Sequence, residues 1–295
     1  MIIGDSNTVT YNGSTNGSVI IGKSHTAAYD NSVIIGKGCT SRAYGLSVGN
    51  TCTATGQAFL FGYNCTGSGT GTSIGSSCST TGSNPGVAIG VSCSATGTNT
   101  ISIGNSNTCS SSTNGIVLGS SGSITHSYCT GLGYYTVSDY IGEFLTSSGG
   151  FTVGSTGTTV KNSVVQVITQ TSSTTPTVMG VAGGVNNTPT NKITLTNTSV
   201  YLFDCDMIAS KTNATGITTD MVARNYKFQM FRGANASTTS ISGITMTSYN
   251  EVAGIGDLAI TADTSNGCPT FTFTAGSSTT TRCVVTCKIT KMAIA

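Results

Sequence analysis

Charged residues are scarce in this sequence, and their scarcity limits what the protein can do. Asp, Glu, Lys and Arg make up 7% of the 295 residues, against about 25% in ordinary soluble domains. None lies between Arg42 and Asp139. A nucleic-acid partner is not expected, because phosphates are bound by lysine and arginine. Carboxylate pairs and histidine triads have few candidates, so we assign no catalytic residue and predict that the chain is not an enzyme.

Tryptophan and long apolar runs are also missing. No stretch approaches the 18 consecutive apolar residues of a membrane-spanning helix, so we expect no membrane insertion. The sequence does not begin with the basic and apolar segments of a signal peptide. We therefore expect either release without the general secretory route, as in cell lysis, or a missing N-terminal anchor. Disorder is not expected, because the net charge is only +2 and β-branched residues are abundant, which favours an all-β fold.

Glycine is abundant, and many of the 39 glycines end a short apolar segment that recurs along the first half of the chain. From Gly22 to Gly133 these glycines lie 14, 13, 13, 13, 15, 14, 15 and 14 residues apart. Neither a helix pair nor a propeller blade fits in so few residues, so each repeat predicts one coil of a parallel β-solenoid. The repeat glycines with an expected structural role are Gly22, Gly36, Gly49, Gly62, Gly75, Gly90, Gly104 and Gly119.

The alternation of residues in each repeat predicts which side chains fill the coil. We expect Val33 and Ile35 to point inward, and likewise Val87 and Ile89 in a later copy. So short a coil buries little apolar surface by itself, and bulky side chains such as that of Phe59 are expected to face elsewhere. Lateral packing of identical chains would cover them, and a three-fold arrangement is the usual one for fibres.

Charge and residue pattern divide the chain into three parts. Residues 1–135 carry the repeats, and residues 136–161 interrupt the period with Asp139 and Glu143, which indicates a neck or transition segment. Residues 162–295 regain charge and contain alternating segments between turn signals, which predicts an antiparallel β-sandwich or jelly roll. The expected strands are residues 164–169, 192–196, 200–208, 226–231, 241–247, 258–262, 271–274 and 283–289.

Five cysteines occupy the third position after a repeat glycine, and His25 holds this position one coil earlier. Stacked coils lie about 4.8 Å apart, within the Cα range of a disulfide. Three roles are open for these cysteines: disulfide bonds, metal binding, or filling of an inner position as small apolar side chains. A straight row does not supply the tetrahedral ligands of a zinc site. We favour the role as small apolar side chains. We assign no metal and no cofactor. The five cysteines are Cys39, Cys52, Cys65, Cys78 and Cys93.

The last part of the chain holds two sets of candidate functional residues. Asp204 and Asp206 share one face of an expected strand and could form a carboxylate pair, although such pairs are more often solvated edge features. Four polar residues in expected loops are candidates for binding a receptor or glycan, the alternative being that they hold strand ends in place. These four are Arg232, Asn235, Asp263 and Asn266.

Both halves of the sequence resemble known proteins. The clearest repeat, Asn-Ser-Val-Ile-Ile-Gly at residues 31–36, resembles the head repeats of trimeric autotransporter adhesins. That resemblance implies a left-handed parallel β-roll with three chains side by side over residues 1–135. Stretches at residues 199–203, 231–239, 261–267 and 281–286 resemble domains that end tail-fibre-like proteins of bacteriophages and other viruses.

These observations predict a homotrimeric fibre with a β-roll followed by a β-sandwich. We expect it on the virion surface, where it attaches a virus or phage to a host-cell surface. Its expected partners are two further copies of itself, a surface glycan or protein receptor, and other virion proteins. The alternatives are a self-assembling filament or capsid-decoration protein, and a bacterial adhesin outside the cell.

Overall fold

The computed structural model describes residues 1–9, 17–27, 31–42, 44–82, 85–110, 113–150, 159–181, 192–212 and 220–294. The chain divides into two compact units, Met1–Val137 and Ser138–Ala295. Strands dominate both, and the described ranges contain one short 3₁₀ helix, Ala236–Thr238. Over those same ranges, no helix combines the length and apolar character needed to cross a membrane. The fold is all-β, as the composition predicts.

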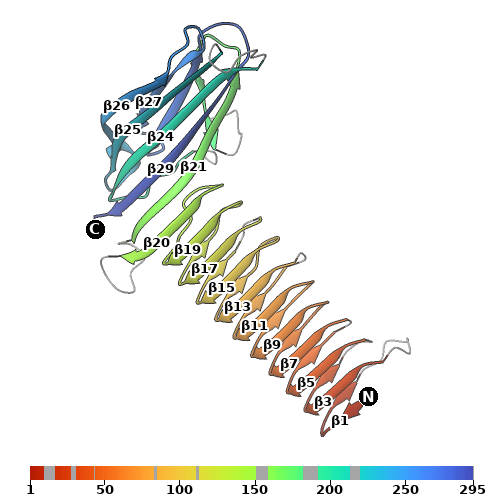
Figure 1. Ribbon diagram of the computed structural model, residues 1–295. Helices are drawn as coiled ribbons and strands as arrows, with labels where there is room; N and C mark the ends of the chain where they lie inside the picture. The colour runs from red at the N-terminus through yellow and green to blue at the C-terminus, as the bar shows by residue number, and fades with distance from the viewer. Residues whose placement is uncertain are drawn as a thin grey trace. The chain divides into compact units, whose positions relative to one another are not determined.

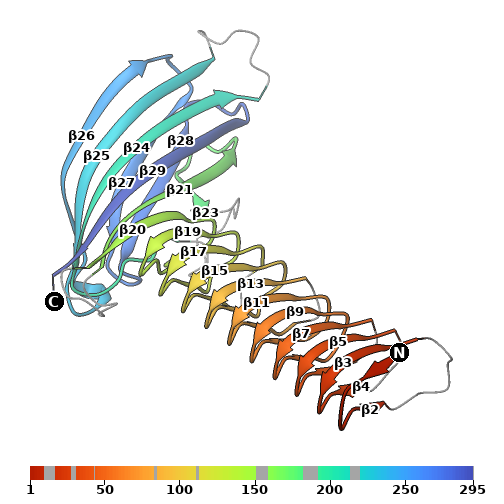
Figure 2. The ribbon, with the colours of Figure 1, turned by 60° about the horizontal axis from the view of Figure 1, so that its bottom comes forward.

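The first unit is a parallel β-solenoid of about nine turns, which confirms the reading of the glycine period (Figure 1). A typical coil contributes a five-residue strand to one sheet and a two-residue strand to the other (Figure 2). The strands of the first sheet are β1 (Ile2–Ile3), β3 (Val19–Lys23), β5 (Val33–Lys37), β7 (Leu46–Asn50), β9 (Phe59–Tyr63), β11 (Thr72–Ser76), β13 (Val87–Val91), β15 (Ile101–Asn105), β17 (Ile116–Ser120) and β19 (Thr130–Tyr134). Those of the second sheet are β2 (Thr8–Val9), β4 (Thr26–Ala27), β6 (Thr40–Ser41), β8 (Thr53–Ala54), β10 (Thr66–Gly67), β12 (Ser79–Thr80), β14 (Ser94–Ala95), β16 (Thr108–Cys109) and β18 (Ser123–Ile124).

The repeat glycine is required by the way the coils stack. Gly62 pairs in register with Gly49 on one side and Gly75 on the other. Its φ is +137°, and a Cβ added there would lie 1.8 Å from the carbonyl oxygen of Gly75. L-residues with a side chain avoid this backbone region, and the clash with backbone leaves no room to adjust. Each coil therefore approaches the next at a distance that only glycine permits.

The prediction of which side chains fill the coil is wrong. Ile34 is the inward residue of β5 and is fully buried, whereas Val33 is half-buried and Ile35 is 37% exposed. The same inversion occurs in β13, where Ala88 points inward between Val87 and Ile89. The interior of so short a coil accepts one side chain from each long strand, not two. The apolar residues on either side of it point out of the coil.

The second unit consists of two antiparallel sheets (Figures 1 and 2). The larger sheet has the order β20–β21–β29–β24–β25–β26, with β23 also paired to β21, and the smaller has the order β22–β28–β27. The strands are β20 (Phe144–Gly150), β21 (Thr159–Thr171), β22 (Thr177–Val178), β23 (Gly180–Val181), β24 (Ser199–Lys211), β25 (Met221–Arg232), β26 (Ser240–Asn250), β27 (Gly256–Asp263), β28 (Cys268–Ala275) and β29 (Thr281–Ala293).

Aromatic side chains form the centre of the core between the two sheets. Phe203 of β24 and Phe228 of β25 stack with ring centroids 4.6 Å apart. Phe228 in turn meets Phe271 of β28 edge to face, with centroids 6.2 Å apart. These contacts join the large sheet to the small one, as expected of a β-sandwich.

Seven of the eight strands predicted for the second unit are confirmed, and the segment 192–196 is the exception. It forms no strand, although Ile193 and Leu195 are buried in the core. Its backbone is held by other partners, since the Leu195 N–H donates to the Gly267 carbonyl and the Leu195 carbonyl accepts from Arg232. Alternating burial therefore arises here without a strand.

The segment expected to form a neck differs from that expectation. Its residues from Ser138 onward belong to the second unit, where β20 pairs with β21 in an antiparallel arrangement. Residues 151–158 of the segment lie outside the described ranges. The side chains of the three charged residues in the segment are 0–11% exposed. Lys161 pairs there with both Asp139 and Glu143.

Candidate functional site

The outward side of the first solenoid sheet is a candidate interaction surface of the first unit. We call it the apolar face: the first and third residues of each long strand from β3 to β19. None of these residues is buried in the single chain. They are Val19, Ile21, Val33, Ile35, Leu46, Val48, Phe59, Phe61, Thr72, Ile74, Val87, Ile89, Ile101, Ile103, Ile116, Leu118, Thr130 and Leu132.

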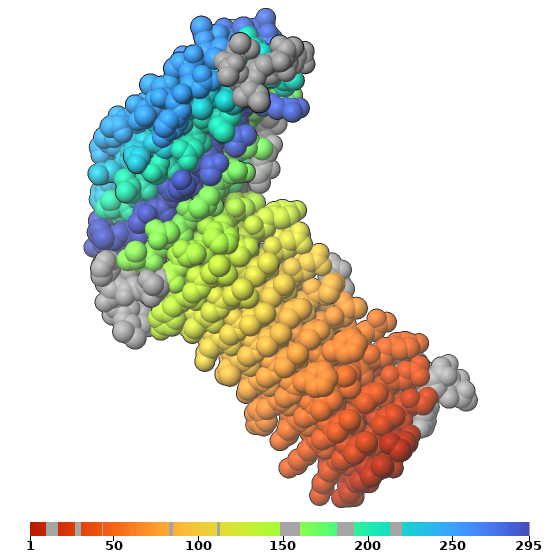
Figure 3. Space-filling model, in the orientation of Figure 1, coloured from red at the N-terminus to blue at the C-terminus, as the bar shows by residue number. Residues whose placement is uncertain are grey.

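In-register stacking makes this face continuous. Phe59 lies beside Leu46 and Thr72, and Phe61 lies beside Val48 and Ile74. The coils form parallel ridges across the solenoid surface (Figure 3). Phe59 is 49% exposed and Phe61 is 40% exposed. Soluble monomers rarely expose a contiguous apolar patch of this extent, so the face has the character of an interaction surface.

In most coils the third residue after the repeat glycine, here called the inner position, provides a hydrogen-bond donor for the next coil; Gly122 and Thr136, which hold this position after Gly119 and Gly133, do not. The Cys65 thiol donates to the Gly75 carbonyl at 3.3 Å, and the Cys93 thiol to the Gly104 carbonyl at 3.2 Å. Asn107 holds the same position with its amide 2.8 Å from the Gly119 carbonyl, and His25 Nε2 lies 2.8 Å from the Gly36 carbonyl. Cysteine, asparagine and histidine thus share the ability to donate a hydrogen bond from this position.

The cysteines of the ladder are free thiols. Cys39, Cys52, Cys65, Cys78 and Cys93 are all buried and none is in a disulfide. Burial raises the pKa of the Cys78 thiol, so it stays protonated at neutral pH and is a poor nucleophile. The sequence led us to predict that these cysteines act as small apolar side chains that fill the coil, and that prediction leaves out the hydrogen bonds that their thiols donate. Asn107, at the same spacing from its own glycine, was the sequence signal that could have revealed it.

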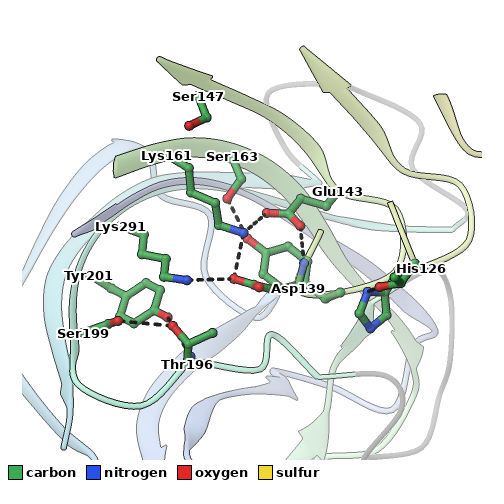
Figure 4. A network of polar contacts seen from close by, with 12 residues as sticks. His126, Asp139, Glu143, Ser147, Lys161, Ser163, Thr196, Ser199, Tyr201 and Lys291 are labelled. Atoms are coloured by element: carbon green, nitrogen blue, oxygen red, sulfur yellow. Dashed lines mark hydrogen bonds and ion pairs between the residues drawn. The ribbon is translucent and has the colours of Figure 1, made fainter. Parts of the chain in front are cut away.

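A buried group of four charged side chains lies in the second unit, and we call it the ion cluster: Asp139, Glu143, Lys161 and Lys291 (Figure 4). Lys161 Nζ lies 2.7 Å from Asp139 Oδ2 and 2.9 Å from Glu143 Oε1. Lys291 Nζ lies 3.4 Å from Asp139 Oδ2. The side chains of Lys161 and Glu143 are 4% and 0% exposed, so this group is withdrawn from water.

Electrostatics within the ion cluster favour the charged forms of Asp139 and Lys161. Burial opposes ionisation of Asp139, but Lys161 and Lys291 outweigh it and hold the pKa of that carboxyl below its ordinary value. Burial likewise opposes the charge on Lys161, but Glu143 and Asp139 outweigh it and raise the pKa of the amine. For Lys291 burial prevails and lowers its pKa. The sequence marks Asp139 and Glu143 as an isolated acidic pair, but nothing local in it identifies the two lysines as their partners.

The four loop candidates split into two that hold strand ends and two that are exposed. Arg232 donates to the carbonyls of Leu195 and Gly267, and Asp263 accepts from Lys192 Nζ at 2.7 Å. Burial opposes ionisation of Asp263, but Lys192 and hydrogen bonds from Asn266 hold its pKa well below the ordinary value. Asn235 and Asn266 are exposed, and each also takes part in a hydrogen bond of its own loop.

Asp204 and Asp206 do lie together on the outer side of the large sheet. The Asn225 amide donates to Asp204 Oδ1 at 2.6 Å and to Asp206 Oδ1 at 2.9 Å. Lys227 and Lys288 pair with the two carboxylates at 3.3 and 3.4 Å. The hydrogen bond from Asn225 is the main reason that the pKa of Asp204 is lowered. Asp204 is therefore ionised at neutral pH, the state of a base rather than of an acid.

Comparisons with known proteins give structural neighbours only. No protein-family model and no curated protein matches this chain. One similar solved structure is the tailspike protein gp49 of Acinetobacter baumannii bacteriophage Fri1, with 8% identity and a TM-score of 0.24 over 97% of this chain. Another is the tailspike of Acinetobacter baumannii phage AM24, with 10% identity and a TM-score of 0.21 over 99% of this chain. The chain spans 62% of the Fri1 protein and 55% of the AM24 protein.

One of these neighbours corrects a prediction made from the sequence. The Fri1 tailspike is described as a capsular polysaccharide depolymerase, which is an enzyme. That description stands against the prediction, drawn from the scarcity of carboxylates and histidines, that this chain is not an enzyme, and we do not maintain it.

Proposed function

We propose that this protein is the subunit of a homotrimeric fibre on a virion surface, and that the fibre attaches to a host-cell surface. The observation that carries the proposal is the apolar face. Its exposed side chains repeat at the same two positions in every coil and stack in register from β3 to β19. A rod with one apolar side along its length is suited to packing against copies of itself.

Burial of this face would stabilise an assembly strongly. Completely burying a side chain such as that of Phe or Ile contributes about 1.5–3 kcal/mol, and these side chains are partly buried already. Phe59, Phe61, Ile74 and Leu118 each retain between 37% and 49% of their surface in water. Because every coil adds such residues, the gain accumulates along the rod.

A cyclic trimer about an axis along the rods supports attachment as well as packing. All three chains then run in the same direction, and each carries its own copy of the second unit. A weak receptor site on each copy would act through its effective concentration, so three sites bind a surface far better than one. The exposed Asn235 and Asn266 are the loop residues available for such contacts, with a surface glycan or protein as receptor.

A charge substitution on the apolar face tests the assembly. Phe61→Asp places a carboxylate in the proposed interface, and we expect it to convert the trimer to monomers in size-exclusion chromatography with light scattering. The matched control is Thr66→Asp, because Thr66 is exposed on the second sheet of the same coil. Equal dissociation by both variants, or by neither, would contradict the proposed interface.

Attachment is tested separately with the full chain. Fluorescent protein applied to an array of bacterial surface polysaccharides and to whole cells is expected to bind a subset of them, with weaker binding by Phe61→Asp because avidity is lost. A monomeric variant that binds as tightly as the parent would contradict multivalent attachment. Absence of binding to every glycan and cell type tested would reject the attachment role while leaving the trimer intact.

A self-assembling filament is the second candidate, and the edge strand β26 is the observation that favours it. Over the described residues β26 pairs with β25 alone, and Ile244, Met246 and Tyr249 are exposed along it. A long, unprotected edge of this kind can pair with another chain. Open-ended polymers in electron microscopy, in place of discrete short fibres, would favour this alternative.

A further inference from the structure

The ion cluster has the composition of a site that joins a lysine to a carboxylate. Lys161 Nζ lies 2.7 Å from Asp139 Oδ2, which places the amine nitrogen within reach of the carboxyl carbon to which that oxygen is bonded. Glu143 touches both partners, since Oε1 lies 2.9 Å from Lys161 Nζ and Oε2 accepts the Asp139 backbone N–H at 2.8 Å. Figure 4 shows Lys161 directed at both carboxylates and Lys291 directed at Asp139.

We propose that Lys161 and Asp139 condense into an intramolecular amide bond, with Glu143 as the catalytic proton carrier. The Lys161 amine attacks the Asp139 carboxyl carbon, a C–N bond forms, and a C–O bond breaks. The two protons that the ammonium group gives up leave with the released oxygen as one molecule of water. Glu143 accepts a proton from the nitrogen and returns it to the leaving oxygen, so it ends unchanged. No oxidant or other co-reactant is needed.

The charges of the cluster explain why four groups are present. Before the reaction two lysines balance two carboxylates, and afterwards Lys291 and Glu143 remain as a balanced pair. Lys291, 3.4 Å from Asp139 Oδ2, is placed to stabilise negative charge on that oxygen during attack.

The surroundings of Lys161 fix its position for attack. Its Nζ lies 5.7 Å from the centre of the Tyr140 ring, and the Tyr140 hydroxyl is 2.7 Å from the Ser163 hydroxyl. Tyr140 and Ser163 are buried, so water has little access from this side. The ion pair remains the more stable protonation state of the reactants, because the pKa of Lys161 is raised and that of Asp139 is lowered. We therefore expect the bond to form slowly after folding.

The proposed amide bond lies where it would carry mechanical load along the chain. Asp139 is the second residue of the second unit, and Lys161 lies in β21, which pairs with β29 over most of its length. A covalent link would pass tension arriving at Ser138 directly to β21 and bypass residues 140–160. The inference is independent of the proposed trimer and of attachment.

Intact mass spectrometry of the denatured full chain tests the bond. We expect the protein to be lighter than its sequence by one water molecule, and Glu143→Gln and Lys161→Arg to keep their full masses. Glu251→Gln, a carboxylate change at the sandwich surface, is the matched control and should still lose water. Asp139→Asn should form the same amide by releasing ammonia, and so reach the same final mass as the parent.

Chymotryptic digestion then locates the change. A branched peptide joining the segment that contains Asp139 to the one that contains Lys161 is expected from the parent chain. This reading does not depend on whether any variant folds. A parent mass equal to that of the sequence, or a water loss in an unbranched peptide as cyclisation of Asp139 would give, would overturn the proposal.

Discussion

The solenoid of Met1–Val137 and the sandwich of Ser138–Ala295 satisfy their buried polar groups with different chemistry. In the solenoid most donors at the inner position are thiols or amides, such as the thiol of Cys65 and the amide of Asn107. In the sandwich they include ions, as in the pairs of Lys161 with Glu143 and Lys192 with Asp263.

Repetition explains this difference. A residue type that recurs in every coil is stacked on itself about 4.8 Å away, where buried like charges would repel strongly. Lys23 and Lys37 do lie side by side in register, but both are exposed to solvent. In the sandwich each position has neighbours of its own, so a buried lysine can be matched to a carboxylate. A stack of coils therefore has to be neutral inside, whereas a sandwich does not.

Substitution of a repeat glycine is expected to give the largest difference between the stabilities of the two units. Gly62→Ala introduces a Cβ at 1.8 Å from the Gly75 carbonyl oxygen at a φ of +137°, so we expect the solenoid to lose more than about 4 kcal/mol. Hydrogen exchange should rise in β9 and β11 while the strands of the sandwich stay protected. Gly82→Ala is the control, because its Cβ would have no neighbour nearer than 3.6 Å. Equal losses in both variants would show that stacking is not the reason.

Truncating a core side chain of the sandwich should have the opposite effect, because it should destabilise the sandwich and not the solenoid. Phe203 is fully buried and stacked on Phe228, so Phe203→Ala is expected to cost the sandwich about 3–5 kcal/mol and leave the solenoid protected from exchange. Leu202→Ala, at a neighbouring residue that is 51% exposed, should cost far less. Loss of protection in the coils as well would mean that the two units unfold together.

Substitutions at the inner position are expected to change stability less, and they test whether the side chain there acts as a hydrogen-bond donor. Cys65→Val fills the space but removes the donor to the Gly75 carbonyl, which should cost about 1–3 kcal/mol in chemical denaturation. Cys65→Asn restores a donor of the kind that Asn107 provides in its own coil, so it should cost less. If valine is tolerated better than asparagine, apolar filling is the better description of this position.

Acid should weaken the sandwich, which holds paired carboxylates with lowered pKa values, more than the coils beyond Arg42, which contain no Asp or Glu. Hydrogen bonds from Arg224 and Ser248 lower the pKa of Glu251 from 4.5 to about 2. Its folded pKa lies below its unfolded one, so its stabilisation is present above pH 4.5 and is lost as the pH falls towards 2. Asp204 has a lowered pKa as well. Each exposed pair contributes about 0.2–1 kcal/mol, and Glu251→Gln should reduce the acid sensitivity measured by denaturation.

Periodicity made the solenoid predictable, but it could not tell one side of a strand from the other. The glycine spacing gives the coil and the register, because only glycine fits at positions such as Gly62. Val33, Ile34 and Ile35 are all apolar, so alternation contains no signal for the inward side. That choice is decided by the width of the coil, which accepts Ile34 alone.

The ion cluster was not predictable, because its members come together only in the folded sandwich. Lys161 is 22 residues from Asp139 and Lys291 is 152 residues from it. The sequence shows two acidic residues after a long uncharged stretch, a pattern equally typical of an exposed transition segment. The antiparallel pairing of β21 with β29 is what brings Lys161 and Lys291 side by side.

The mass of the assembled protein in solution tests the central claim most directly, since the apolar face is proposed to be covered by two further copies. Sedimentation equilibrium of the full chain at neutral pH is expected to give three times the mass of the 29.7 kDa chain. The mass of a single chain, with Phe59 and Phe61 left in water, would contradict the account.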